Sequence, residues 1–233
     1  MNIFQGLYPY EIMIMGLGAL LFVVSLIALI IYLIQGKSIG GLVVFFLLSL
    51  GMLGYPRLKS VQYKDGIISM EFFEQQLQQH PEDLQARADL SRGLQAVQGR
   101  PADAKSSLII AKAQWALGNE QAALASLQPA VREPSTNRDA TALSQRIENV
   151  RQLEQLTAKA EQNRTAADKA ELERQLSQVI REPVVSPQTA ATVARAHAVL
   201  GQNEQAAKSA QKALTINPNL AAAPQLKAIL QPH

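Results

Sequence analysis

The strongest constraint on this chain is a run of 23 uncharged, mostly apolar residues at positions 12–34. A helix of that length is about 34 Å long, enough to cross a hydrocarbon core of about 30 Å. A cleaved signal peptide would need a basic N-terminal region and a shorter apolar stretch. Residues 1–11 contain neither Lys nor Arg. We therefore predict a retained transmembrane helix.

A second uncharged run covers residues 39–55 and ends before Pro56, after a short polar loop at 35–38. Its 17 residues are near the lower limit for a membrane span, so a re-entrant or buried helix is the alternative. We interpret residues 1–56 as a two-helix transmembrane anchor. Glycines in such helices let backbones approach closely, within the hairpin or against a partner's helix. The candidate packing positions are Gly16, Gly18, Gly40, Gly51 and Gly54.

Charge divides the chain into two parts. Residues 1–55 hold only Glu11 and Lys37 of the chain's 22 Lys/Arg and 19 Asp/Glu. In the remainder, single basic residues alternate with acidic ones, which is typical of a solvated helix surface. Nucleic-acid binders instead concentrate Lys and Arg in patches, so we expect no nucleic-acid partner. The chain has no cysteine, which excludes disulfides and thiolate metal sites.

The polar part is predicted to be all-α after a short connection. Residues 57–70 contain Asp65-Gly66 between β-prone residues, so a juxtamembrane linker and a small hairpin are both open. Residues 71–233 are rich in good helix formers, with Pro and Gly at the breaks. We predict helices near 70–79, 83–98, 102–117, 120–132, 138–162, 165–181, 187–200, 203–216 and 220–230.

Two predicted helix pairs share a pattern of small residues around a turn glycine. The first has Ala111, Leu117, Gly118, Ala123 and Ala130, and the second has Ala194, Leu200, Gly201, Ala206, Ala213 and Pro218. This pattern resembles the tetratricopeptide repeat (TPR), a helix–turn–helix unit of about 34 residues. The resemblance implies a TPR-like α-solenoid in which these residues form the contact between paired helices and Pro218 ends the second helix.

The resemblance covers residues 102–134 and 187–218. Pro134 and Pro183 are 49 positions apart, too far for one repeat. Residues 138–182 are therefore either degenerate repeats or a separate insertion, with one long helix at 138–162. The segment 220–230 is expected to cover the exposed apolar face of the last repeat.

The sequence contains no pattern typical of an enzyme. His80, His197 and His233 have no partner at metal-ligand spacing. No HExxH, GxSxG or phosphate-binding glycine loop occurs. We therefore expect no catalytic, cofactor or metal site.

An anchor joined to helical repeats favours a membrane-tethered scaffold for protein–protein interaction, either an accessory subunit or an adaptor of a larger membrane complex. The expected partners are the lipid bilayer, integral membrane subunits, and a peptide or helix in the repeat groove. The alternative is a membrane-anchored assembly factor or chaperone. In layout the chain is similar to the membrane-anchored TPR subunit of bacterial cytochrome c haem ligation. The short loop at 35–38 departs from that family, so its function is not carried over.

The basic residues next to the spans predict topology in the cell (inner) membrane, with a periplasmic domain as the alternative. Arg57, Lys59 and Lys64 follow the second span, against Lys37 alone in the loop. Basic residues near a span favour the cytoplasmic side, so both the N-terminus and the helical domain are expected in the cytoplasm. A reporter that works only in the cytoplasm, fused after His233, should be active. Activity of a periplasm-dependent reporter at the same site would place the domain outside.

Overall fold

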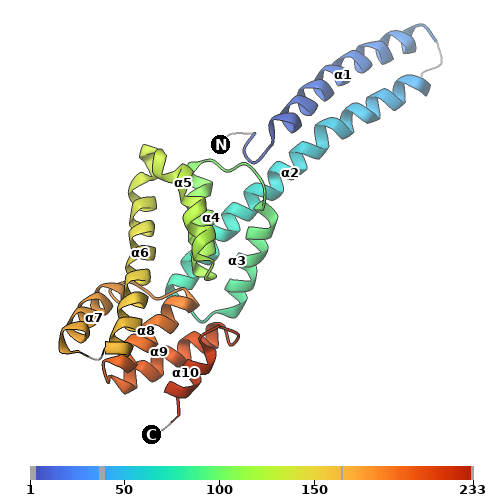
Figure 1. Ribbon diagram of the computed structural model, residues 1–233. Helices are drawn as coiled ribbons and strands as arrows, with labels where there is room; N and C mark the ends of the chain where they lie inside the picture. The colour runs from blue at the N-terminus through green and yellow to red at the C-terminus, as the bar shows by residue number, and fades with distance from the viewer. Residues whose placement is uncertain (1–3, 37–39, 164, 232–233) are drawn as a thin grey trace. The chain divides into compact units, whose positions relative to one another are not determined.

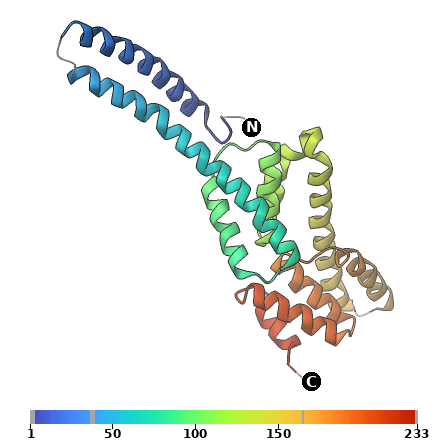
Figure 2. The same cartoon turned by 180° about the vertical axis from the view of Figure 1, so that it is seen from behind.

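The computed structural model describes residues 4–36, 40–163 and 165–231. Within these ranges all regular secondary structure is helical, and Figures 1 and 2 show the ten helices from two sides. Their bounds are α1 Pro9–Ile34, α2 Gly40–Gln79, α3 Leu84–Val97, α4 Ala104–Ala116, α5 Glu120–Arg132, α6 Pro134–Asn163, α7 Ala166–Val179, α8 Pro187–Val199, α9 Asn203–Ile216 and α10 Ala223–Ile229. The all-α expectation is confirmed. Lys37, Ser38, Ile39 and His233 lie outside the described residues.

The chain forms two compact units. The first, which we call the anchor unit, comprises Met1–Gly66 and Gln95–Ala102. The second, the helical unit, comprises Ile67–Leu94 and Asp103–His233. Both α2 and α3 contribute residues to each unit.

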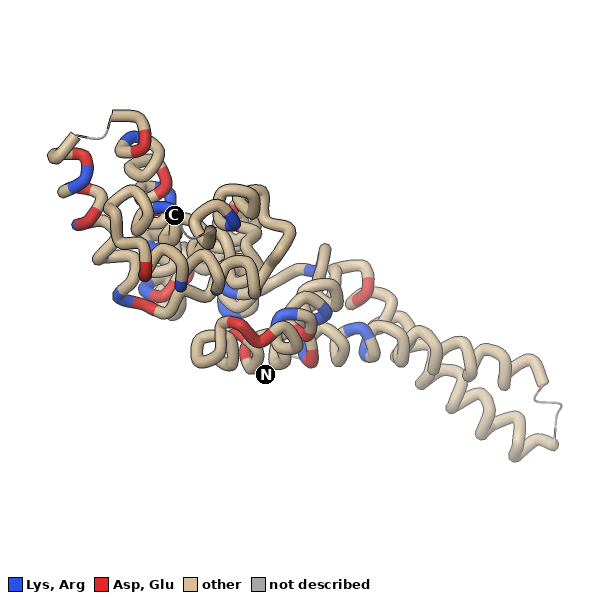
Figure 3. The backbone as a smooth tube through the Cα atoms, turned by 90° about the horizontal axis from the view of Figure 1, so that it is seen from below, with Lys and Arg blue, Asp and Glu red and all other residues tan. Residues whose placement is uncertain are grey.

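Helices α1 and α2 are long and apolar enough to cross a membrane. In each, only 11% of the most apolar window is buried, whereas a core helix of a soluble protein would be mostly buried. Figure 3 shows the far half of this hairpin without charged residues. The apolar surface is thus available to a surrounding medium of the same polarity.

The two helices of the hairpin approach each other at Gly18 and at an aromatic pair. A side chain at Gly18 would come within 2.8 Å of the Met52 Cβ, so the backbones approach closely there. The rings of Phe22 and Phe46 lie 5.1 Å apart between centroids. The other candidate positions differ, because nothing lies within 4 Å of a Cβ built on Gly16, Gly40, Gly51 or Gly54.

The expected linker or hairpin at residues 57–70 is wrong. Helix α2 continues through this segment to Gln79, and Pro56 lies inside it. Ser60, Tyr63, Ile67 and Met70 are buried at helical spacing, and their packing outweighs the local turn tendency of Asp65-Gly66. The helix predicted at 70–79 is the last part of α2.

The helix pairs α4–α5 and α8–α9 have the same turn. Gly118 and Gly201 have positive φ angles of 89° and 76°, which glycine adopts without strain. The next residue in each turn, Asn119 or Gln202, donates its N–H to the carbonyl five positions earlier, at 2.8 Å and 2.9 Å. These hydrogen bonds close α4 and α8 in the Schellman manner. The two helix pairs therefore share the same turn geometry.

The hydrophobic core of the helical unit includes two buried clusters that each span several neighbouring helices. One buried cluster joins residues of α4, α5, α6, α7 and α8, and a second joins α8, α9 and α10. Helix α6 has one buried face and contacts α4, α5, α7 and α8, so residues 134–163 form part of this continuous array. Leu226 of α10 is fully buried at the C-terminal end, where a terminal covering helix was expected.

A buried arginine joins three segments of the helical unit. Arg87 of α3 donates through Nε to the Pro81 carbonyl at 3.1 Å and through Nη1 to the Ala116 carbonyl at 2.7 Å. Its Nη2 donates to the carbonyls of Pro81 and Val185 at 2.6 Å and 2.5 Å. Burial lowers the pKa of Arg87 to about 10, so the side chain remains charged at neutral pH.

The contact within α8–α9 yields a test of register. Ala206 is fully buried whereas Ala207 is half-buried. Ala206→Leu should overpack the contact and lower the free energy of unfolding by about 1–3 kcal/mol. Thermal unfolding followed by circular dichroism measures this, with Ala207→Leu as the control. Greater damage from Ala207→Leu would contradict the register.

Arg87 provides a second test. Arg87→Met leaves the carbonyls of Pro81, Ala116 and Val185 without this donor, and we expect a loss of about 2–4 kcal/mol in the free energy of unfolding. Arg92→Met on the exposed face of the same helix should cost less than about 0.5 kcal/mol. Equal effects in thermal unfolding would show that Arg87 does not hold these segments.

Candidate protein-interaction surface

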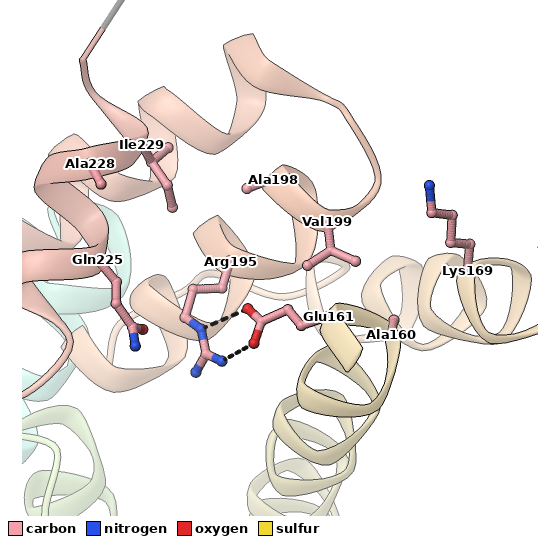
Figure 4. A pocket seen from close by; sticks show the side chains of 9 residues that line it. All are labelled: Ala160, Glu161, Lys169, Arg195, Ala198, Val199, Gln225, Ala228 and Ile229. Atoms are coloured by element: carbon pink, nitrogen blue, oxygen red, sulfur yellow. Dashed lines mark hydrogen bonds and ion pairs between the residues drawn. The ribbon is translucent and has the colours of Figure 1, made fainter. Parts of the chain in front are cut away.

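A hollow of about 560 Å³ in the helical unit lies among α6, α7, α8 and α10. We call it the interaction hollow. Figure 4 shows the nine side chains that line it. Five are apolar and small or medium in size: Ala160, Ala198, Val199, Ala228 and Ile229. Four are polar or charged: Glu161, Lys169, Arg195 and Gln225.

The charged groups of the interaction hollow are partly neutralised within it. Arg195 of α8 donates to Glu161 of α6 through Nη2 at 2.9 Å and through Nε at 3.3 Å. This two-point geometry holds both side chains in defined orientations. Lys169 on α7 adds a second basic group, so the lining has two basic residues and one acidic residue. The lining therefore combines small apolar side chains with one more basic than acidic residue.

A smaller hollow of about 270 Å³ is bordered by α2, α4, α6 and the connection before α8. Arg146 occupies its wall: the guanidinium lies 4.5 Å from the Trp115 ring centroid, and Nη1 lies 2.6 Å from a Glu182 carboxylate oxygen. Burial lowers the pKa of Arg146. Trp115 itself is buried in the core cluster. Arg146 already pairs with Glu182 and lies over the Trp115 ring, so we interpret this hollow as part of the fold and not as a binding site.

The anchor unit has its own charged cluster at the start of α1. Glu11 is only 3% exposed, and its carboxylate lies 2.8 Å from Arg100 Nη1. The same Nη1 donates to the Gly6 carbonyl at 3.1 Å, and the Tyr8 hydroxyl donates to the Gly99 carbonyl. These bonds join residues 95–102 to the first turn of α1. A buried charge is expensive without a partner, so Arg100 is what allows Glu11 to lie next to an apolar helix.

The structure brings the predicted repeat residues together at the paired helices. Six of these repeat residues are buried alanines: Ala111, Ala123, Ala130, Ala194, Ala206 and Ala213. Leu117 and Leu200 cap the C-termini of α4 and α8, Gly118 and Gly201 form the turns, and Pro218 follows α9. None of them lines the interaction hollow. Their place in the structure is the packing of the paired helices.

Sequence reasoning missed the residues of the interaction hollow. Glu161 and Arg195 are 34 positions apart, and no local spacing links them. Glu11 could have been singled out, because it is the first charged residue and precedes an uncharged run. His197 Nδ1 lies 2.5 Å from the Gln202 side-chain oxygen and belongs to the α8–α9 turn. Among the described residues, no group of three His, Cys, Asp or Glu is placed to hold a metal ion.

Comparison with known proteins gives no relative: no protein-family model, curated protein or solved structure matches this chain.

Proposed function

We propose that this protein is a membrane-tethered scaffold whose helical unit is a TPR-like α-solenoid and binds a peptide or helix of another protein. The observation that carries the proposal is the interaction hollow, a concave surface with mixed apolar and charged lining. Such hollows between stacked helices receive extended or helical segments of partners. The partner segment has small apolar side chains and a carboxylate that pairs with Lys169.

The apolar hairpin supports a membrane setting for this interaction. Helices α1 and α2 insert in the lipid bilayer of the cell membrane and hold the helical unit at its cytoplasmic surface. The partners are therefore proteins of the same membrane, and the chain acts as an accessory subunit or adaptor of their complex. The exposed apolar surface of α1 and α2 supports this setting, because exposing such a surface to water is unfavourable for a soluble monomer.

Filling the hollow tests the proposal. Ala228 is an exposed residue on the α10 side of the hollow, so Ala228→Trp should block the partner without disturbing the core. Tagged full-length protein would be purified from membranes in mild detergent and the associated proteins quantified by mass spectrometry. We expect Ala228→Trp to reduce recovery of the partner at least about tenfold, the loss given by roughly 1.4 kcal/mol of binding free energy.

The matched control is Ala167→Trp, which adds the same side chain to an exposed position of α7 outside the hollow. It should leave recovery unchanged. Fixed stoichiometry of the recovered protein supports the subunit function, whereas many clients at low stoichiometry would favour the assembly factor or chaperone. Equal recovery with Ala228→Trp and wild type would contradict binding in the hollow.

A further inference from the structure

Helix α2 buries one face from Pro56 onward. Its buried positions there recur every three or four residues and include Pro56, Ser60, Tyr63, Ile67 and Met70. In an ordinary surface helix the opposite face is polar where it meets water.

The opposite face of α2 is exposed and mostly apolar. With successive spacings of four and three residues, it consists of Leu47, Gly51, Gly54, Leu58, Val61, Asp65, Ile68 and Phe72, which we call the α2 seam. Exposure is 57% for Leu58, 54% for Ile68 and 61% for Phe72. Asp65 is the single charged member. Polar residues border the seam, among them Arg57, Gln62, Lys64, Glu71 and Gln75.

Lipid cannot cover the whole seam. The uncharged run ends at Tyr55, and Ile68 and Phe72 lie 13 and 17 residues further along the same helix. At 1.5 Å per residue these positions are about 20 Å and 26 Å along α2 from the end of the run. Apolar side chains exposed at that distance, with a polar border, indicate a protein-binding surface.

We infer that the α2 seam binds the same seam of a second copy of this chain, as a parallel two-helix coiled coil. Alternating spacings of three and four residues are the pattern of such a coil, and from Leu47 to Phe72 the seam covers roughly four heptads, about 39 Å. The partner that covers the α2 seam must be a helix that leaves the membrane and continues beside α2 for this length. A second copy provides such a helix.

Membrane insertion sets the symmetry of the pair. Two copies with the same topology are related by a twofold axis perpendicular to the bilayer, which brings identical faces of α2 together, parallel and in register. Nothing lies within 4 Å of a Cβ built on Gly51 or Gly54. The backbone of a second helix can therefore approach closely within the bilayer, where small residues favour packing.

The charge of Asp65 is compatible with self-pairing. In a parallel coiled coil, Asp65 occupies an a position. A residue at an a position lies beside the g residue of the other helix, which here is the residue directly before Asp65. Asp65 is thus flanked by Lys64 of the second copy, and the symmetric pair forms this contact twice. These contacts offset the repulsion between the two Asp65 carboxylates and disfavour a shifted register.

Disulfide cross-linking in native membranes tests the pairing, since the chain contains no cysteine. Val61→Cys and Ile68→Cys place a thiol in the seam, and Gln62→Cys and Glu71→Cys place one on the exposed border. A disulfide forms only when the two Cα atoms are within about 7 Å, so seam positions should give at least about fivefold more cross-linked dimer than border positions. Equal yields, or no dimer, would overturn the inference. A cross-linked product that contains a different protein would also overturn self-pairing.

A charge substitution gives an independent readout. Ile68→Glu with Phe72→Glu places like charges in the seam, and both side chains are exposed, so each copy should keep its helical circular dichroism. In detergent, light scattering should report the mass of a dimer for the wild type and for the control Gln62→Glu, and half that mass for the double variant. A monomeric wild type, or a double variant that remains dimeric, contradicts pairing through the seam. Neither outcome depends on a partner in the interaction hollow.

Discussion

The guanidinium of Arg87 organises the helical unit because it uses backbone carbonyls as its partners. The turn after α2, the end of α4 and the connection before α8 each direct a carbonyl at it, and Val185 is 98 residues away in sequence. Ala116 is the last residue of α4, where the unpaired carbonyls carry partial negative charge. A buried cation therefore satisfies acceptors that a helix end leaves open. This arrangement requires the three segments to be in place at once, so Arg87 links them in the folded unit.

Around this centre, small side chains decide how the helices pair. Fully buried alanines on α4 and α5, and on α8 and α9, allow each pair to pack closely, and a glycine with positive φ turns the chain between them. The same residues explain how much could be predicted. Pro and Gly mark nearly every helix end, so most helix bounds were predicted within a few residues, and the turn glycines identified the paired helices before any packing was known.

What the sequence did not reveal depends on contacts between distant residues. Asp65-Gly66 has a strong local turn signal, yet burial of Tyr63, Ile67 and Met70 keeps this segment helical. The pairs Glu11–Arg100 and Glu161–Arg195 join residues 89 and 34 positions apart, so no local spacing links the partners. The interaction hollow arises from four helices that end near one another, a property of tertiary packing and not of any local motif.

The two proposed surfaces use separate parts of the chain. The interaction hollow is lined from α6, α7, α8 and α10, and the seam lies on α2, so no side chain serves both. A pair of chains joined through α2 carries two hollows, and a partner with two matching segments then binds the second one at a raised effective concentration. In this proposal both proteins are confined to one membrane, which reduces the freedom lost on association. Each hollow can therefore bind its segment weakly, which agrees with a lining that has small apolar residues and no large exposed anchor.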